Sequence, residues 1–145
     1  MATILSVAKY IQSRFDNISS MKLQKLTYYS QAWNLVWEER ELFHEDFEAW
    51  ANGPVSPDLY ARHRGEFLIH PQMFDDIPDD LTEIEKENID KVLVHYGDKT
   101  AQWLSDLTHI EYPWENTRQL ACVEDGERCS AIITKGEMHL YYSGL

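Results

Sequence analysis

The chain has 145 residues, of which 43% are hydrophobic and 12% aromatic. This composition excludes a disordered chain, and the length suits one domain with its own core, so we expect a single domain over residues 1–145. The formal net charge of −12 argues against stand-alone binding to nucleic acid or to an anionic membrane, because both depend on positive charge. The excess of acidic residues suits a basic protein partner, or it only maintains solubility.

The acid is unevenly distributed along the chain. Up to residue 36 the chain carries a net charge of +3, and the remainder carries −15. The short basic portion is the one place where nucleic acid could be held, and strong salt dependence would reveal it. The acidic remainder makes that function improbable.

Two cysteines, Cys122 and Cys129, are too few for a disulfide scaffold. No stretch reaches the roughly 20 apolar residues that span a bilayer, and the apolar residues 2–8 lack the flanks of a signal peptide. These features predict a cytoplasmic protein with reduced thiols and no membrane partner.

The first two elements are predicted to be helices. Ile4, Ala8, Ile11 and Phe15 recur at helical spacing, which predicts an amphipathic helix over residues 2–15. Residues 20–37 are apolar on most of the circumference of a helix, so we expect a central helix there that the rest of the chain surrounds. Ser19 or Ser20 is the expected cap at its start. The fold class is therefore mainly α.

One stripe of the central helix is polar but uncharged. Gln24, Thr27, Gln31 and Asn34 follow one another at spacings of three and four residues, where a surface helix would carry Lys and Glu. We favour internal hydrogen-bond partners for this stripe, because buried polar groups are reliably paired. The alternative is that the stripe faces another molecule.

A small β-hairpin is predicted near residues 42–50. Short alternation favours strands over residues 42–44 and 47–50, turning at Glu45 and Asp46. Residues 52–54, Asn-Gly-Pro, then break the chain, and Ser56 with Pro57 starts another helix.

The second half of the chain is predicted to be helical around an ordered loop at residues 66–81. Thr82 and Glu85 form a capping box that opens a helix ending at Gly97, and a short amphipathic helix follows over residues 100–109. Pro113 begins one more turn. We expect an exposed loop over residues 120–128, a short extended piece at 130–133, and a last helix opened by a second capping box, Thr134 with Glu137.

Motifs of catalysis, metal binding and phosphate binding are absent from the sequence, which predicts no enzyme and no cofactor. The alternative is a small metal- or His-dependent hydrolase that uses His109 with Thr108, Cys122 or a carboxylate. A zinc site built from the two cysteines and His109 or His139 would need wider spacing than usual zinc motifs show.

Two groups of residues are candidates for binding a partner. Trp50, Gly53, Pro54, Val55 and Tyr60 combine rigid backbone with large aromatic residues, a pattern typical both of a turn packed on a core and of a peptide-docking surface. Thr108 and His109, close to Trp114, either tie a helix junction together or serve a partner.

Three segments in order, KLQKLTYYSQAW (residues 22–33), FEAWANGPVSPDLY (47–60) and LTHIEYPWENTR (107–118), carry a resemblance. The chain resembles the SocA-like, or Panacea, antitoxin domain family, which includes phage-associated GepA-like proteins, over residues 4–142. The resemblance implies a mostly helical domain that is usually encoded beside a toxin and neutralises it by protein contact. One member type instead acts as an adaptor that delivers its toxin to a ClpXP protease.

The resemblance and the polar stripe together define the candidate site. We expect a cognate toxin protein from the adjacent gene as the partner, with a ClpXP-type protease as a second partner if the chain is an adaptor. The candidate partner-binding residues are Lys25, Gln31, Trp50, Gly53, Pro54, Val55, Tyr60, Thr108 and His109.

Overall fold

The computed structural model describes residues 2–145 and is mainly helical, with one small antiparallel sheet. In chain order the elements are α1 (Ile4–Gln12), α2 (Ser20–Glu38), β1 (Phe47–Trp50), β2 (Gly53–Val55), α3 (Pro57–His63), the 3-10 helix η1 (Pro71–Phe74), α4 (Glu83–Tyr96), α5 (Ala101–Ile110), α6 (Tyr112–Leu120), β3 (Ile132–Ile133) and α7 (Lys135–Ser143). The predicted fold class is confirmed.

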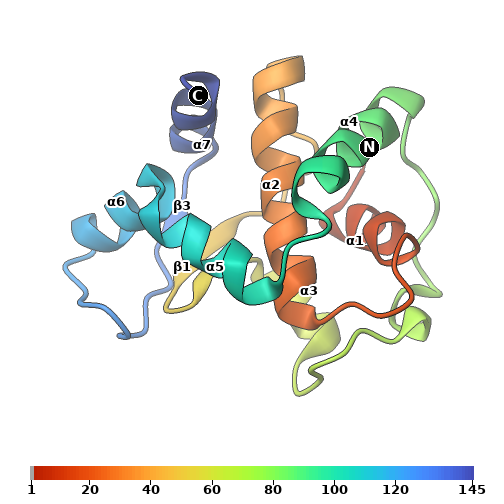
Figure 1. Ribbon diagram of the computed structural model, residues 1–145, viewed down its shortest axis with the longest axis horizontal. Helices are drawn as coiled ribbons and strands as arrows, with labels where there is room; N and C mark the ends of the chain where they lie inside the picture. The colour runs from red at the N-terminus through yellow and green to blue at the C-terminus, as the bar shows by residue number, and fades with distance from the viewer. Residues whose placement is uncertain (1) are drawn as a thin grey trace.

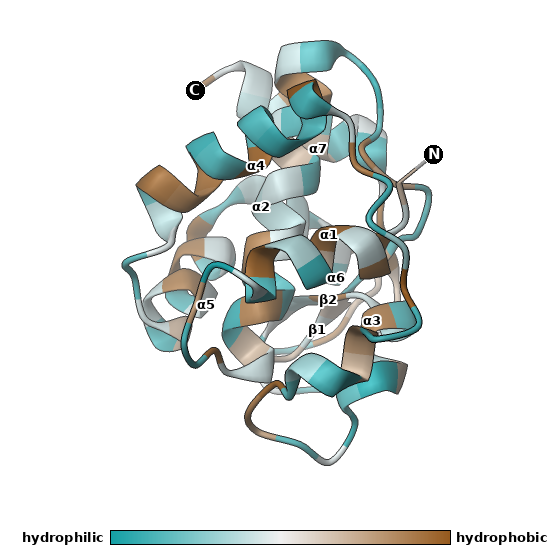
Figure 2. Cartoon of the chain, turned by 90° about the vertical axis from the view of Figure 1, so that its right-hand side faces the viewer, coloured by the Kyte–Doolittle hydropathy of each residue, from teal (hydrophilic) through white to brown (hydrophobic). Residues whose placement is uncertain are grey.

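Helix α2 is the central element, as its sequence predicts. It packs against α1, α4, α5, α7 and β2, and Figure 1 shows it running through the middle of the molecule, with α7 on one side and α1 and α4 on the other. The part of α2 visible in Figure 2 is largely pale, because Tyr, Trp, Ser and Thr have intermediate hydropathy. Mean hydropathy alone would not have marked it as the core helix.

Several helix starts lie where the sequence places them. Ser19 caps α2, its Oγ accepting the Lys22 N–H at 3.1 Å, and Ser56 caps α3 with Pro57 in the first turn. The capping box of α4 is complete, with bonds of 2.8 and 3.2 Å between Thr82 and Glu85. Local side-chain chemistry therefore determines these boundaries.

The predicted hairpin is half right. Residues 47–50 are a strand, but its partner is β2, with Trp50 opposite Gly53, so the turn lies at residues 51–52 rather than at Glu45 and Asp46. On its other edge β1 pairs with β3. The strand expected over residues 42–44 is wrong, because that segment is irregular.

A side chain from α2 explains why residues 42–44 form no strand. Gln31 Oε1 accepts the N–H of Leu42 at 2.7 Å, and Gln31 Nε2 donates to the carbonyl of Phe43 at 2.7 Å. These two backbone groups already have hydrogen-bond partners in the Gln31 side chain, so they need none from a neighbouring strand.

The whole uncharged stripe of α2 is buried, which confirms the internal interpretation. Gln24 bonds to Ser56 and His63, Asn34 Nδ2 donates to the Arg40 carbonyl at 3.0 Å, and Thr27 Oγ1 donates to the Gln24 carbonyl at 2.8 Å. The stripe therefore holds the chain that follows α2.

Helix α6 is longer than the single turn expected at Pro113. Its buried residues are Pro113, Trp114, Thr117 and Arg118, a face without the apolar repeat that predicts a helix. Arg118 donates to the carbonyls of Ala49, Glu124 and Glu127 at 2.9, 2.8 and 2.7 Å, so it joins α6 to β1 and to the loop over residues 121–131.

The second capping box forms only in part. Thr134 Oγ1 accepts the Glu137 N–H at 3.1 Å, as predicted. The Glu137 carboxylate, however, accepts from Asn116 Nδ2 at 2.6 Å and from Thr117 Oγ1 at 3.3 Å. The carboxylate therefore connects α7 to α6 instead of completing its own cap.

A buried carboxyl group ties three helices together. Glu111, between α5 and α6, accepts the hydroxyl of Tyr29 in α2 at 2.6 Å and that of Tyr142 in α7 at 2.7 Å. Burial raises the pKa of Glu111, and the two hydroxyl bonds oppose that rise because they favour the charged form.

None of the helices within residues 2–145 combines the length and the apolar character that a bilayer crossing requires.

Substituting Gln31 tests its structural role. In Gln31→Leu both backbone partners stay buried without a bond, so we expect the free energy of unfolding to fall by about 2 to 4 kcal/mol. Urea denaturation measures this loss. Gln102→Leu is the matched control, because Gln102 is exposed and its side chain donates to Asp106 on the surface of the same helix. Equal stability of the two variants would contradict the role of Gln31.

Candidate functional site

The three sequence segments meet at Gly53. A Cβ atom placed on Gly53 would lie 2.6 Å from Lys25 Cε and 3.0 Å from Thr108 Oγ1, and Lys25 Nζ donates to the Pro54 carbonyl at 3.2 Å. Gly53 has a φ of +121°, a conformation that other residues rarely adopt. We call Lys25, Gly53, Pro54 and Thr108 the Gly53 junction. It locks α2, β2 and α5 together.

The Gly53 junction contains an unpaired buried cation. Lys25 is fully buried and, within residues 2–145, forms no ion pair. Burial lowers its pKa to about 7, because the interior solvates the ammonium group poorly. The ammonium group of Lys25 therefore loses its proton far more readily than that of an exposed lysine.

The residues of the hydrolase alternative do not form a catalytic arrangement. Thr108 Oγ1 is buried and donates to the Ser105 carbonyl at 2.7 Å, while Cys122 is exposed. His109 stacks on Trp114 with ring centroids 4.0 Å apart, and its Nε2 has no hydrogen-bond partner among the described residues. Burial lowers the pKa of His109. A nucleophile needs a base within hydrogen-bond reach, so nothing here supports the hydrolase.

Within residues 2–145 no group of three or more His, Cys, Asp or Glu side chains is arranged to hold a metal ion.

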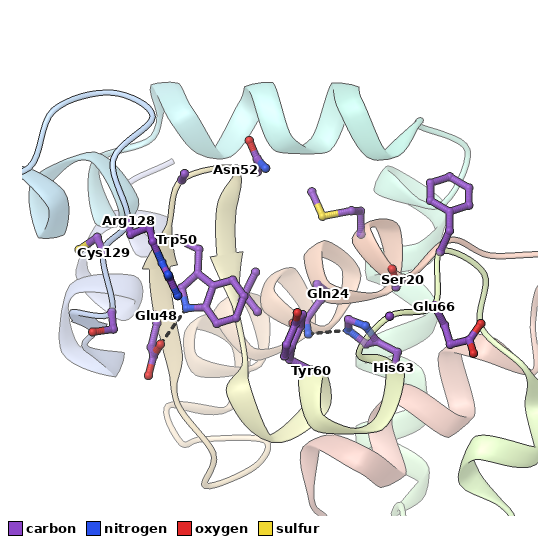
Figure 3. Close-up of a pocket in the computed structure, with 16 residues that line it drawn as sticks. Ser20, Gln24, Glu48, Trp50, Asn52, Tyr60, His63, Glu66, Arg128 and Cys129 are labelled. Carbon is purple, nitrogen blue, oxygen red and sulfur yellow. Dashed lines mark hydrogen bonds between the residues drawn. The ribbon is translucent and has the colours of Figure 1, made fainter.

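A cavity of about 750 Å³ lies beside the Gly53 junction (Figure 3). We call it the Trp50 pocket. It is lined by Ser20, Met21, Gln24, Glu48, Trp50, Ala51, Asn52, Val55, Tyr60, His63, Gly65, Glu66, Phe67, Arg128, Cys129 and Ser130. Its volume lies within the range of ligand-binding clefts.

Three rings form one wall of the Trp50 pocket. The Trp50 and Tyr60 rings meet edge to face with centroids 5.0 Å apart, and Tyr60 meets His63 in the same manner at 5.3 Å. The backbone of Trp50 is held by Trp114, whose Nε1 donates to the Trp50 carbonyl at 2.8 Å. The wall therefore has little freedom to move.

The floor of the pocket is a polar network centred on Gln24. Gln24 Oε1 accepts the N–H of Ser56 at 2.9 Å, which identifies Nε2 as the donor to the Ser56 carbonyl at 3.2 Å and to His63 Nε2 at 3.0 Å. His63 is therefore neutral, with its proton on Nδ1. Burial and the nearby Lys25 charge both lower the pKa of His63, which favours the same state.

Comparison with known proteins identifies the family. The sequence model described as "Antitoxin SocA-like, Panacea domain" matches residues 23–115. The chain belongs to this antitoxin family. A curated relative, Antitoxin SocA of Caulobacter vibrioides (strain NA1000 / CB15N), is 32% identical over 110 residues, which cover 68% of this chain and 58% of the relative. The chain thus matches less than two thirds of that relative's length. The search of solved structures found no match.

The region matched to the SocA-like family contains the complete Gly53 junction and most of the Trp50 pocket. Residues outside it supply the rest of the pocket lining, namely Ser20, Met21, Arg128, Cys129 and Ser130. The resemblance seen in the sequence is therefore confirmed, and the shared region includes the aromatic wall.

The structure divides the nine candidate binding residues into three groups. Trp50, Val55 and Tyr60 line the Trp50 pocket. His109 lines a second cavity of about 400 Å³ that shares Ala51 with the first. The others are buried away from both cavities: Lys25, Gln31, Gly53, Pro54 and Thr108.

Sequence reasoning missed several residues of the Trp50 pocket, including Met21, Glu48, His63 and Phe67. Phe67 lies in a stretch expected to drape over the core, but the residue is 73% exposed. The sequence of this loop carries no signal that separates the exposed Phe67 from the buried Phe74.

Gly53→Ala tests the junction. The added methyl group would collide with the buried Lys25 and force an unfavourable φ, so we expect a loss of stability about 2 kcal/mol larger than that of Gly126→Ala. Gly126 is the matched control, since it has a φ of +82° with no atom within 4 Å of the added methyl. Chemical denaturation of both variants gives the comparison, and equal losses would refute the close approach.

Lys25→Met tests the buried ammonium group through its pH dependence. The pKa of Lys25 is about 7 in the folded chain, whereas an exposed lysine of the unfolded chain has a pKa of about 10.4, so between these pH values the unfolded chain binds more protons. Wild-type stability should therefore rise from pH 7 to about 9.5, by up to about 3 kcal/mol from this group. The difference between wild type and Lys25→Met, measured by urea denaturation across this range, should show that rise. If the stabilities of wild type and Lys25→Met change with pH in the same way, Lys25 is not the titrating group.

Proposed function

We propose that the chain is an antitoxin that neutralises a toxin protein by binding it directly. The observation that carries the proposal is the match of residues 23–115 to the SocA-like, Panacea domain family, together with a relative named Antitoxin SocA. The proposed toxin is the product of the adjacent gene. The proposed compartment is the cytoplasm, where two free cysteines would stay reduced.

Physical features support a binding role over a catalytic one. His109, Thr108 and Cys122 do not form a nucleophile and base pair. The net charge of −12 favours fast encounter with a basic protein. A rigid aromatic wall next to a cavity offers the kind of anchor on which protein interfaces depend.

Co-expression with the adjacent gene tests the proposal. Cells that make the neighbouring protein alone should stop growing, cells that also make this chain should grow, and the two proteins should co-purify as a complex. The same plasmid with the start codon of this chain removed is the control. A neighbour that is harmless, or that is toxic but does not bind, would refute the proposal.

A purified system separates direct neutralisation from delivery to a protease. Direct binding predicts that the chain inhibits the purified toxin in proportion to its amount, without any protease. An adaptor predicts instead that toxin disappears faster only when a ClpXP-type protease is present, with no inhibition in its absence.

A further inference from the structure

We propose that the Trp50 pocket is the docking site for a toxin segment that inserts one large apolar side chain and carries a Lys or Arg next to it. This inference rests on the proposed function and names the surface and the chemistry of the contact. Three features of the pocket support it: the exposed Phe67 at the rim, the floor groups that already have hydrogen-bond partners, and the carboxylates of the lining.

Phe67 is exposed although its backbone is firmly held. The Phe67 carbonyl accepts the Ser20 N–H at 2.8 Å, the N–H of Ile69 donates to the Ile18 carbonyl at 3.0 Å, and Ser19 pairs with Leu68 as a β-bridge. The residue is nevertheless 73% exposed. The fold therefore fixes a large aromatic ring in water at the rim of the pocket, where it gains nothing from burial until a partner covers it.

The interior of the Trp50 pocket favours an apolar occupant. Gln24 bonds to both backbone groups of Ser56 and to His63 Nε2, so these floor groups already have partners within the fold. Trp50, Tyr60, Val55 and Met21 supply apolar lining. A preformed concave site with aromatic walls is where binding hot spots concentrate.

The charges around the opening favour a basic neighbour for that apolar side chain. Glu48 Oε1 accepts from Trp50 Nε1 at 2.7 Å, and within residues 2–145 Glu48 forms no ion pair. Glu66 lies at the other end of the pocket, beyond His63 in Figure 3. Arg128 is the one basic side chain among the residues that line the pocket. Two carboxylates against one guanidinium give the lining a formal net charge of about −1, of the same sign as the whole chain, which favours a basic group on the partner.

Binding measurements on rim variants test the docking site. With the purified toxin from the adjacent gene as the probe, Phe67→Ala and Tyr60→Ala should each raise Kd at least tenfold. Glu48→Lys should also raise Kd at least tenfold and weaken its dependence on salt. Thermal melting of each variant checks that the fold is intact.

Matched controls lie on other surfaces of the chain. Val94→Ala and Leu140→Ala remove equally exposed apolar groups, and Glu87→Lys makes the same charge reversal at an exposed position outside the pocket. All three should stay within about twofold of the wild-type Kd. If wild type binds the toxin but the rim variants bind as well as the controls, the docking site is refuted while the antitoxin function stands. If wild type does not bind, the proposed function itself fails.

A photo-crosslinker tests the chemistry of the occupant. Replacing Phe67 by benzoylphenylalanine should capture a toxin peptide that contains a large apolar residue adjacent to Lys or Arg. Capture of an acidic peptide, of a second copy of this chain, or of a small molecule that co-purifies with it would overturn the proposal.

Discussion

The polar stripe of α2 holds the chain that follows it, and the rest of the structure depends on this constraint. Asn34 bonds to the Arg40 carbonyl, Gln31 to Leu42 and Phe43, and Gln24 to both backbone groups of Ser56. These bonds run in order along the helix, so residues 40–56 follow α2 back toward its start. Inside a core each such bond is costly to lose, which gives this path few alternatives.

Two buried basic side chains also hold the hairpin formed by β1 and β2. Lys25 of α2 donates to the Pro54 carbonyl, and Arg118 of α6 donates to the Ala49 carbonyl. Within the described part of the chain neither forms an ion pair, so backbone dipoles take the place of carboxylates. Desolvation makes the ammonium group costly, whereas the guanidinium of Arg118 reaches three carbonyls at once. The Gly53 junction is therefore closely packed, and it buries an ammonium group whose desolvation lowers the stability of the fold.

Holding the hairpin rigid shapes the surface beside it. The same Gln24 that fixes Ser56 also bonds to His63, which supports Tyr60 and thereby the aromatic wall. Buried and cavity-lining residues thus alternate along one segment, with Gly53 and Pro54 facing inward and Trp50 and Tyr60 lining the cavity. Residues 47–60, one of the segments that resemble the SocA-like family, contain both buried and cavity-lining residues. The buried residues hold the neighbouring surface in place.

By itself the sequence determined most of the helices, because helix starts depend on neighbouring residues such as Thr82 with Glu85 and Ser56 with Pro57. It also indicated the central helix, the buried stripe and the family, each of which rests on spacing within a short stretch. Only the tertiary structure decided the partner of β1, the full length of α6 and the residues of the Trp50 pocket. Gln31 keeps residues 42–44 out of the sheet by binding the backbone of Leu42, and Arg118 joins α6 to Ala49, 69 residues away in sequence. The pattern within a single strand or helix predicts neither contact.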